Sequence, residues 1–144
     1  KRRSRKRKLS KSNTKFNPKV LSLILTPGLS KEIFESIVQS GCHGIILKAF
    51  GAGNVPDILV SVLKTARSLS VPVVVLSQCT NGVTRMQLYE VGNQALKAGA
   101  IPGRDMTLEA ASTKLMWVLA QTKNISEIKS YFKKSLVGEM TEHN

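Results

Sequence analysis

The chain contains few of the side chains that usually bind metals or carry out catalysis. Its 144 residues include only two histidines and two cysteines, Cys42 and Cys79. Two cysteines supply neither a CxxC metal pair nor a disulfide framework, which indicates a reducing compartment. Two scattered histidines are too few for a metal site. We therefore expect no metal and no cofactor, and we expect a cytoplasmic protein.

Aromatic residues and long apolar runs are also scarce. Aromatic residues make up 5% of the chain, whereas hydrophobic residues make up 42%. Such a core is built from valine, isoleucine, leucine and alanine, which is typical of α/β proteins. No apolar run approaches the roughly 18 residues that cross a bilayer, so we expect no membrane partner. The length fits a single domain.

The net charge of +13 is concentrated at the N-terminus. Residues 1–19 contain ten of the 22 lysines and arginines and no acidic residue. The rest of the chain contains the other 12 basic residues and 9 acidic residues. A block such as "KRRSRKRK" repels itself and cannot bury apolar surface. We predict a basic disordered arm or linker at residues 1–15 and an α/β domain at residues 16–144. Nucleic-acid binding by the arm stays open, although no aromatic residue lies among its charges to stack on bases.

Apolar segments alternate with helical patterns along the rest of the chain. This order predicts a small doubly wound, Rossmann-like parallel sheet of about four strands with flanking helices. The expected strands lie at residues 20–25, 45–50 and 71–78, with a short edge strand within 99–102. Five helices are expected, and the first three begin at Ser30, Pro56 and Met86. The fourth begins at either Thr107 or Asp105, and the fifth runs from near Ser126 to near Ser135. The helix from Met86 to Ala98 is expected to bury Leu88, Val91, Ala95 and Leu96.

Three loops follow predicted strands and should meet at one edge of the sheet. They are "TPG", "GAGN" and "SQCTNG", and ligands of such sheets bind beyond the carboxyl ends of the strands. In "GAGN", Gly51 and Gly53 let the backbone approach a ligand, while Asn54 can donate and accept hydrogen bonds. That combination suits an amino acid or an amide. The alternative is an ordinary turn in which Asn54 caps the next helix.

No complete catalytic set is present in the sequence. A dinucleotide fingerprint, a P-loop and a GxSxG elbow are all absent. Ser77 and Cys79 are possible nucleophiles at a strand end, but neither has a base nearby in sequence. We expect no catalytic residue in this chain.

Five motifs, taken in order, resemble the C-terminal domain of the cytoplasmic, type I L-asparaginases. They are "TPG", "GIILKAFGAGNVP", "VVVLSQCTNGVT", "YEVGNQALKAGAIPGRDMTLEAASTKLMWVLA" and "SLVGEMT", and the resemblance runs from about Phe16 to the end. The family's N-terminal domain carries a threonine nucleophile in a "TGGTI"-like turn, and neither "TGGT" nor "TDT" occurs here. The resemblance therefore implies a separated C-terminal domain or fragment that is inactive alone.

The resemblance also implies a reaction, partners and residue roles. The parent would hydrolyse L-asparagine to L-aspartate and ammonia as a homo-oligomer, either a dimer or a tetramer, together with its own N-terminal domain. Gly53 and Asn54 would orient the substrate's α-amino or α-carboxylate group in a neighbouring subunit. Cys79 matches a cysteine of an allosteric asparagine pocket in bacterial members. Lys48 stands where that pocket has arginine, which would remove bidentate carboxylate binding.

Two other functions stay open at this point. The chain is also similar, less closely, to the asparaginase-like subunit of the archaeal glutamyl-tRNA(Gln) amidotransferase, which would require a partner subunit and tRNA. A third possibility is a non-enzymatic Rossmann-like module whose basic arm, residues 1–15, binds RNA.

Overall fold

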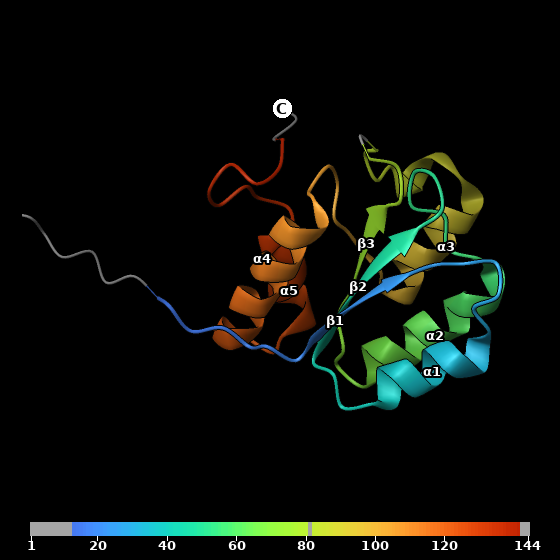
Figure 1. Ribbon diagram of the computed structural model, residues 1–144, viewed down its shortest axis with the longest axis horizontal. Helices are drawn as coiled ribbons and strands as arrows, with labels where there is room; N and C mark the ends of the chain where they lie inside the picture. The colour runs from blue at the N-terminus through green and yellow to red at the C-terminus, as the bar shows by residue number, and fades with distance from the viewer. Residues whose placement is uncertain (1–12, 81, 142–144) are drawn as a thin grey trace, which may run out of the picture.

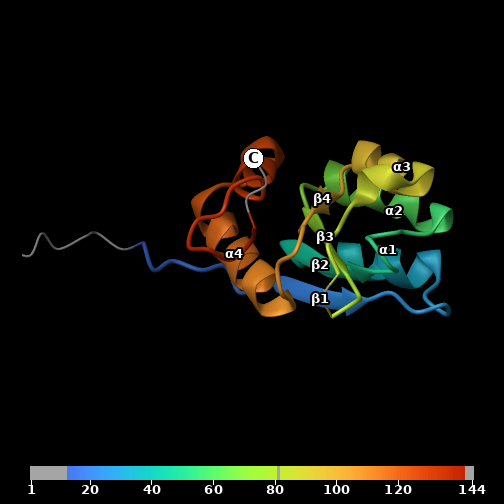
Figure 2. The ribbon, with the colours of Figure 1, turned by 90° about the horizontal axis from the view of Figure 1, so that it is seen from above.

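The computed structural model describes residues 13–80 and 82–141. Its centre is a four-stranded parallel sheet in the order β1-β2-β3-β4, of which Figure 1 labels the first three strands and Figure 2 all four. The strands are β1 (Val20–Ile24), β2 (Gly44–Ala49), β3 (Val73–Ser77) and β4 (Ile101–Pro102). The predicted α/β class, the parallel sheet of about four strands and the short edge strand are confirmed.

Helices cover both faces of the sheet. They are α1 (Lys31–Gln39), α2 (Asp57–Ser68), α3 (Glu90–Ala98), α4 (Leu108–Gln121) and α5 (Ile125–Tyr131), with a short 3-10 helix η1 (Met86–Leu88). Figure 2 shows α1, α2 and α3 on one side of the sheet and α4 on the other. The strand order follows the chain without reversal, so the sheet itself opens no crevice between diverging loops.

Side chains of β2 alternate between two hydrophobic cores, as expected for a central strand. Ile45 and Leu47 are fully buried in the core that contains α1, α2 and α3. Ile46 is fully buried in the core that contains α4 and α5. Strand periodicity therefore places Lys48, two residues after Ile46, on the α4 side of the sheet.

Side-chain caps begin two of the helices where the sequence predicted them. Ser30 Oγ accepts a hydrogen bond from Ile33 N at the start of α1. Thr107 Oγ1 accepts one from Ala110 N at the start of α4, so Thr107 and not Asp105 is the cap. These oxygens satisfy N–H groups that have no partner within the helix.

The prediction of one helix over residues 86–98 is wrong. Extended Tyr89, with φ −127° and ψ 147°, separates η1 from α3. The two pack without space between them, because a β-carbon on Gly92 would lie 2.0 Å from Met86 O. The break removes Leu88 from the helical register, so its side chain is 63% exposed instead of buried. Ala95 is buried as predicted.

The last helix ends at Tyr131, four residues earlier than predicted. The segment beyond it is held by Lys114 of α4, whose side chain is buried. Lys114 Nζ donates to Lys134 O at 2.6 Å and pairs with Glu139 Oε1 at 2.5 Å. Lys114 lies inside the apolar stripe of α4, and its polar contacts hold the C-terminal segment against this helix.

The predicted basic arm falls mostly outside the described residues, since only residues 13–15 of it are described. From Asn13 the chain follows α4: Trp117 Nε1 donates to Asn13 O at 3.0 Å, and Asn17 N donates to Met116 O at 2.9 Å. The arm boundary and nucleic-acid binding remain predictions. Within the described part of the chain, no helix has the length and apolar character needed to span a bilayer.

Candidate functional site at the carboxyl ends of the strands

The ends of β1, β2 and β3 lie level with one another. Ile24 is in register with Lys48, and Ala49 is in register with Ser77. The loops that follow these strands therefore leave the sheet at the same edge, as the sequence predicted.

The turn after β2 is closed by its own backbone. Asn54 N and Gly53 N both donate to Phe50 O, at 2.8 and 3.0 Å, and Phe50 N donates to Asn54 O at 3.2 Å. Gly51 has a φ of 49° and Gly53 a φ of 102°, in the region that side chains disfavour. The two glycines of "GAGN" therefore permit a fold-back that other residues would strain.

Asn54 does not cap the following helix. The cap position of α2 is Pro56, and no side chain accepts a hydrogen bond from the first turn. Asn54 Oδ1 is buried and has no hydrogen-bond partner among the described residues. A buried amide oxygen without a donor costs free energy on the order of 1 kcal/mol or more. The alternative of an ordinary capping turn is thus not what the structure contains.

Thr84, which was not predicted as a site residue, covers this turn. A β-carbon on Gly53 would lie 2.6 Å from Thr84 Cγ2. Beside it, Arg85 N donates to Ala52 O at 2.9 Å. Thr84 is 5% exposed, and its Oγ1 also lacks a hydrogen-bond partner among the described residues. Two unpaired buried oxygens therefore lie on adjoining segments.

Ser77 and Gln78 connect the three strand ends. Ser77 Oγ donates to Gly51 O at 2.7 Å and accepts from Cys79 N at 3.0 Å. Gln78 Nε2 donates to Leu25 O at 2.7 Å and to Lys48 O at 3.1 Å. The Ser77 hydroxyl is thus occupied in a structural hydrogen bond.

The two residues of the expected allosteric pocket lie at the same edge but are not joined. Lys48 is half-buried near the end of β2, and Cys79 is exposed beyond β3. In residues 13–80 and 82–141, no hydrogen bond links their side chains.

The Glu109 backbone N–H and the Thr107 hydroxyl are the main causes that lower the pKa of Glu109, and Lys48 lies close enough to the first turn of α4 to lower it further.

Neither a metal centre nor a cysteine nucleophile is assembled in the described residues. They contain no group of three or more histidine, cysteine or acidic side chains that could hold a metal ion. Cys42 is buried, with its thiol 3.5 Å from Ile37 O. The ring of the adjacent His43 instead contacts Asn17 Nδ2 at 2.8 Å. The site can therefore recognise a ligand that donates hydrogen bonds, such as an ammonium or amide group, but it has no assembled acid and base.

Comparison with known sequences finds relatives over most of the chain. The glutaminase/asparaginase C-terminal domain matches residues 19–132. The chain is 41% identical over 130 residues to the L-asparaginase of Thermococcus kodakarensis, covering 88% of this chain and 39% of that protein. It is 39% identical over 130 residues to a subunit of the glutamyl-tRNA(Gln) amidotransferase of Methanobrevibacter smithii, covering 90% of this chain and 30% of that protein.

Solved structures show the same likeness. The thermostable L-asparaginase of Thermococcus kodakarensis superimposes with a TM-score of 0.83 at 38% identity, covering 88% of this chain and 39% of that one. L-asparaginase I of Vibrio cholerae gives a TM-score of 0.79 at 37% identity, covering 87% and 38%. The chain thus spans 30% to 39% of the length of these relatives.

Proposed function

Because this chain belongs to the glutaminase/asparaginase C-terminal domain family, we propose that it is the C-terminal domain of an amidohydrolase that converts L-asparagine and water to L-aspartate and ammonia. The threonine nucleophile belongs to the N-terminal domain of the same enzyme. This domain contributes substrate binding through Gly53 and Asn54, and it contributes an oligomer surface.

The unpaired oxygen of Asn54 carries this proposal. Asn54 Oδ1 is buried, without a donor among the described residues, in the turn beyond the carboxyl end of β2. The α-ammonium group of asparagine is a charged donor of the kind that such an acceptor requires. Because the turn is closed by its backbone and tied to β3 through Ser77, the backbone that carries Asn54 is held in place before the ligand arrives.

The site is incomplete within one chain, since no acid, base or nucleophile is assembled beside Asn54 among the described residues. We therefore place Asn54 at a boundary between subunits, where it orients a substrate that a neighbouring N-terminal domain attacks. A dimer or a larger homo-oligomer meets this requirement. Asn54 then acts through binding geometry and not through proton transfer.

Kinetics of the intact protein test this role. Asn54→Leu removes the hydrogen-bond acceptor and keeps a similar side-chain volume. KM for L-asparagine should therefore rise about 10- to 100-fold, which is the loss of affinity expected when one charge-assisted hydrogen bond is removed. Asn54→Asp keeps an acceptor and should lose less. Gln94→Ala, which removes an exposed amide on α3, should leave KM unchanged. An unchanged KM in Asn54→Leu would refute the assignment.

The amidotransferase function is the alternative, because the sequence identity of that enzyme's subunit to this chain is nearly that of the asparaginase. The two functions differ in what they require. Ammonia release from free L-asparagine by the purified intact protein supports the asparaginase. Activity that appears only with a partner subunit and tRNA supports the amidotransferase. Asn54 would orient the amide donor in either case.

Lys48 and Cys79 are proposed as a regulatory pair at the same edge. An effector carboxylate would reach Lys48 on the α4 side of β2, with Cys79 beyond β3. The ammonium group of lysine gives a point charge without the bidentate geometry of arginine. We therefore propose that effector binding at this position is weak in this protein.

A further inference from the structure

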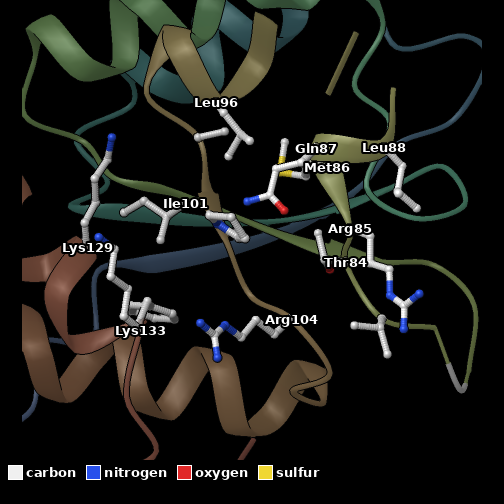
Figure 3. A pocket seen from close by; sticks show the side chains of 14 residues that line it. Thr84, Arg85, Met86, Gln87, Leu88, Leu96, Ile101, Arg104, Lys129 and Lys133 are labelled. Atoms are coloured by element: carbon white, nitrogen blue, oxygen red, sulfur yellow. The ribbon is translucent and has the colours of Figure 1, made fainter. Parts of the chain in front are cut away.

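A basic cavity lies at the β4 edge of the sheet, between η1, α3 and α5. Its volume is about 650 Å³, which is the size of a site for an organic ligand. Its lining includes four cationic side chains, Arg85, Arg104, Lys129 and Lys133, and no aspartate or glutamate among the described residues. In Figure 3, Lys129 and Lys133 lie on one side, Arg85 lies on the opposite side and Arg104 lies between them.

The described part of the chain does not neutralise these four charges. In residues 13–80 and 82–141, none of their side chains forms an ion pair or a hydrogen bond. The pKa of Lys129 is lowered by burial, and then by repulsion from Arg67 and Lys133. The cavity therefore concentrates positive charge at a free-energy cost that a bound anion would relieve.

Thr84 supplies an independent indication of a ligand. It lines the cavity, it is 5% exposed, and its Oγ1 has no hydrogen-bond partner among the described residues. Buried hydroxyl groups in folded proteins nearly always have a partner. A ligand oxygen in the cavity would provide one.

The floor of the cavity is apolar. Its apolar lining with surface open to a ligand consists of Val83, Leu88 and Leu96, of which Leu88 is 63% exposed and the other two are half-buried. Inorganic phosphate alone would leave this surface unmatched. A ligand with both a charged group and an apolar body would cover the floor while its charge meets the cations.

We propose that this cavity binds a small organic phosphate with an apolar body, of the chemical class of the nucleoside phosphates. The phosphate group contacts Arg104 and Lys133, the apolar body lies on the floor, and a ligand oxygen pairs with the Thr84 hydroxyl. This site is separate from the Asn54 amide, and it does not depend on the proposed hydrolysis of asparagine.

Calorimetric titration of the intact protein tests the site. AMP and ATP are the probes, with adenosine lacking the charge and inorganic phosphate lacking the apolar body. AMP or ATP should bind saturably with one ligand per chain, and at least tenfold more tightly than adenosine or phosphate. Arg104→Ala and Lys133→Ala should each weaken binding about tenfold.

Two variants separate a specific site from general attraction of anions. Lys64→Ala removes an exposed lysine on α2, outside the cavity, with the same change in net charge, and its affinity should stay within twofold of the unmodified protein. Thr84→Val should weaken binding severalfold, while Thr84→Ser, which keeps the hydroxyl, should restore it. Thermal unfolding of each variant checks that the fold is retained.

Three results would overturn the proposal. The first is the absence of saturable binding of AMP and ATP up to about 1 mM. The second is an equal loss of affinity in Lys64→Ala and Lys133→Ala, which would show nonspecific attraction. The third is a structure of the intact protein in which carboxylates of another domain or subunit fill the cavity.

Discussion

Thr84 packs directly on Gly53, so closely that a β-carbon at Gly53 would lie 2.6 Å from Thr84 Cγ2. Real β-carbons essentially never come so near another heavy atom. The turn after β2 and the segment before η1 therefore form one unit, which carries both unpaired buried oxygens. A side chain added at Gly53 should therefore push against Thr84 and distort the turn that carries Asn54.

Gly53→Ala should destabilise the protein strongly. The substitution adds a clash with Thr84 and places alanine at a φ of 102°. Overpacking and backbone strain each cost about 1 to 3 kcal/mol. We expect a loss of at least about 2 kcal/mol in the free energy of unfolding, measured by denaturant or thermal unfolding of the intact protein.

Gly28→Ala is the matched control, because Gly28 has no atom within 4 Å of a built β-carbon and no positive φ. Its stability should change by less than about 0.5 kcal/mol. Adding Thr84→Ser to Gly53→Ala removes the clashing methyl group and should recover part of the loss, leaving the backbone strain. A Gly53→Ala variant as stable as Gly28→Ala would contradict the close packing.

Gln78→Met should loosen all three strand ends. The side-chain amide donates to Leu25 O and Lys48 O, and methionine fills similar space without a donor. Two carbonyls lose a partner, so stability should fall by about 1 to 3 kcal/mol. Gln78→Glu places a charged acceptor against the same carbonyls and should be worse. Hydrogen exchange at the β1 and β2 ends should quicken in both variants and stay unchanged in Gln94→Ala.

Periodicity and turn residues were enough to predict the sheet, most helix starts and the edge where the site lies. Helix 86–98 was wrongly predicted as continuous because the residues of η1 keep a helical apolar pattern, while the break at Tyr89 arises from packing of Met86 on Gly92. This contact depends on how η1 and α3 pack in space. The spacing of apolar residues along the sequence does not reveal it. The last helix ended early for a similar reason, since tertiary bonds from Lys114 hold the segment after it.

Some residues of the candidate site could be predicted from the sequence and others could not. "GAGN" indicated a backbone turn by itself, because positive φ angles favour glycine. Thr84 and Gln78 gave no comparable signal, since a threonine in a loop and a glutamine after a strand are ordinary in sequence. Their importance comes from what they contact, Gly53 in one case and two strand-end carbonyls in the other. The role of Asn54 in substrate binding stays a prediction.

The ion pair between Lys114 and Glu139 should make the free energy of unfolding depend on pH in the acidic range. Burial tends to raise the pKa of Glu139, but Lys114 and the backbone N–H groups of Val137, Glu139 and Leu136 lower it to about 2. The folded pKa lies below the ordinary value of 4.5, so the stabilisation is present above about pH 4.5 and is lost as the pH falls toward 2. Unfolding measured from pH 7 to pH 2.5 should show a loss on the order of 2 kcal/mol from this group.

Glu139→Gln provides the comparison for this effect. It should be less stable than the unmodified protein at pH 7, and the difference should shrink as the pH falls through that window. Glu35→Gln removes an exposed ion pair with Lys31, 3.7 Å apart, and should change stability by less than about 1 kcal/mol at any pH. A parallel pH dependence in Glu139→Gln and the unmodified protein would contradict the role of this carboxylate.

Lys48→Arg tests the proposed regulatory pair without changing charge. Lys48 is half-buried on the α4 side of β2, where a guanidinium group could hold a carboxylate with two parallel hydrogen bonds. The asparagine saturation curve of the intact protein should become more sigmoidal, with effector affinity raised about tenfold. Cys79→Ala in the same background should remove the gain, whereas Lys64→Arg should have no effect. Identical curves for Lys48→Arg and the unmodified protein would mean that this edge of the sheet has no effector site.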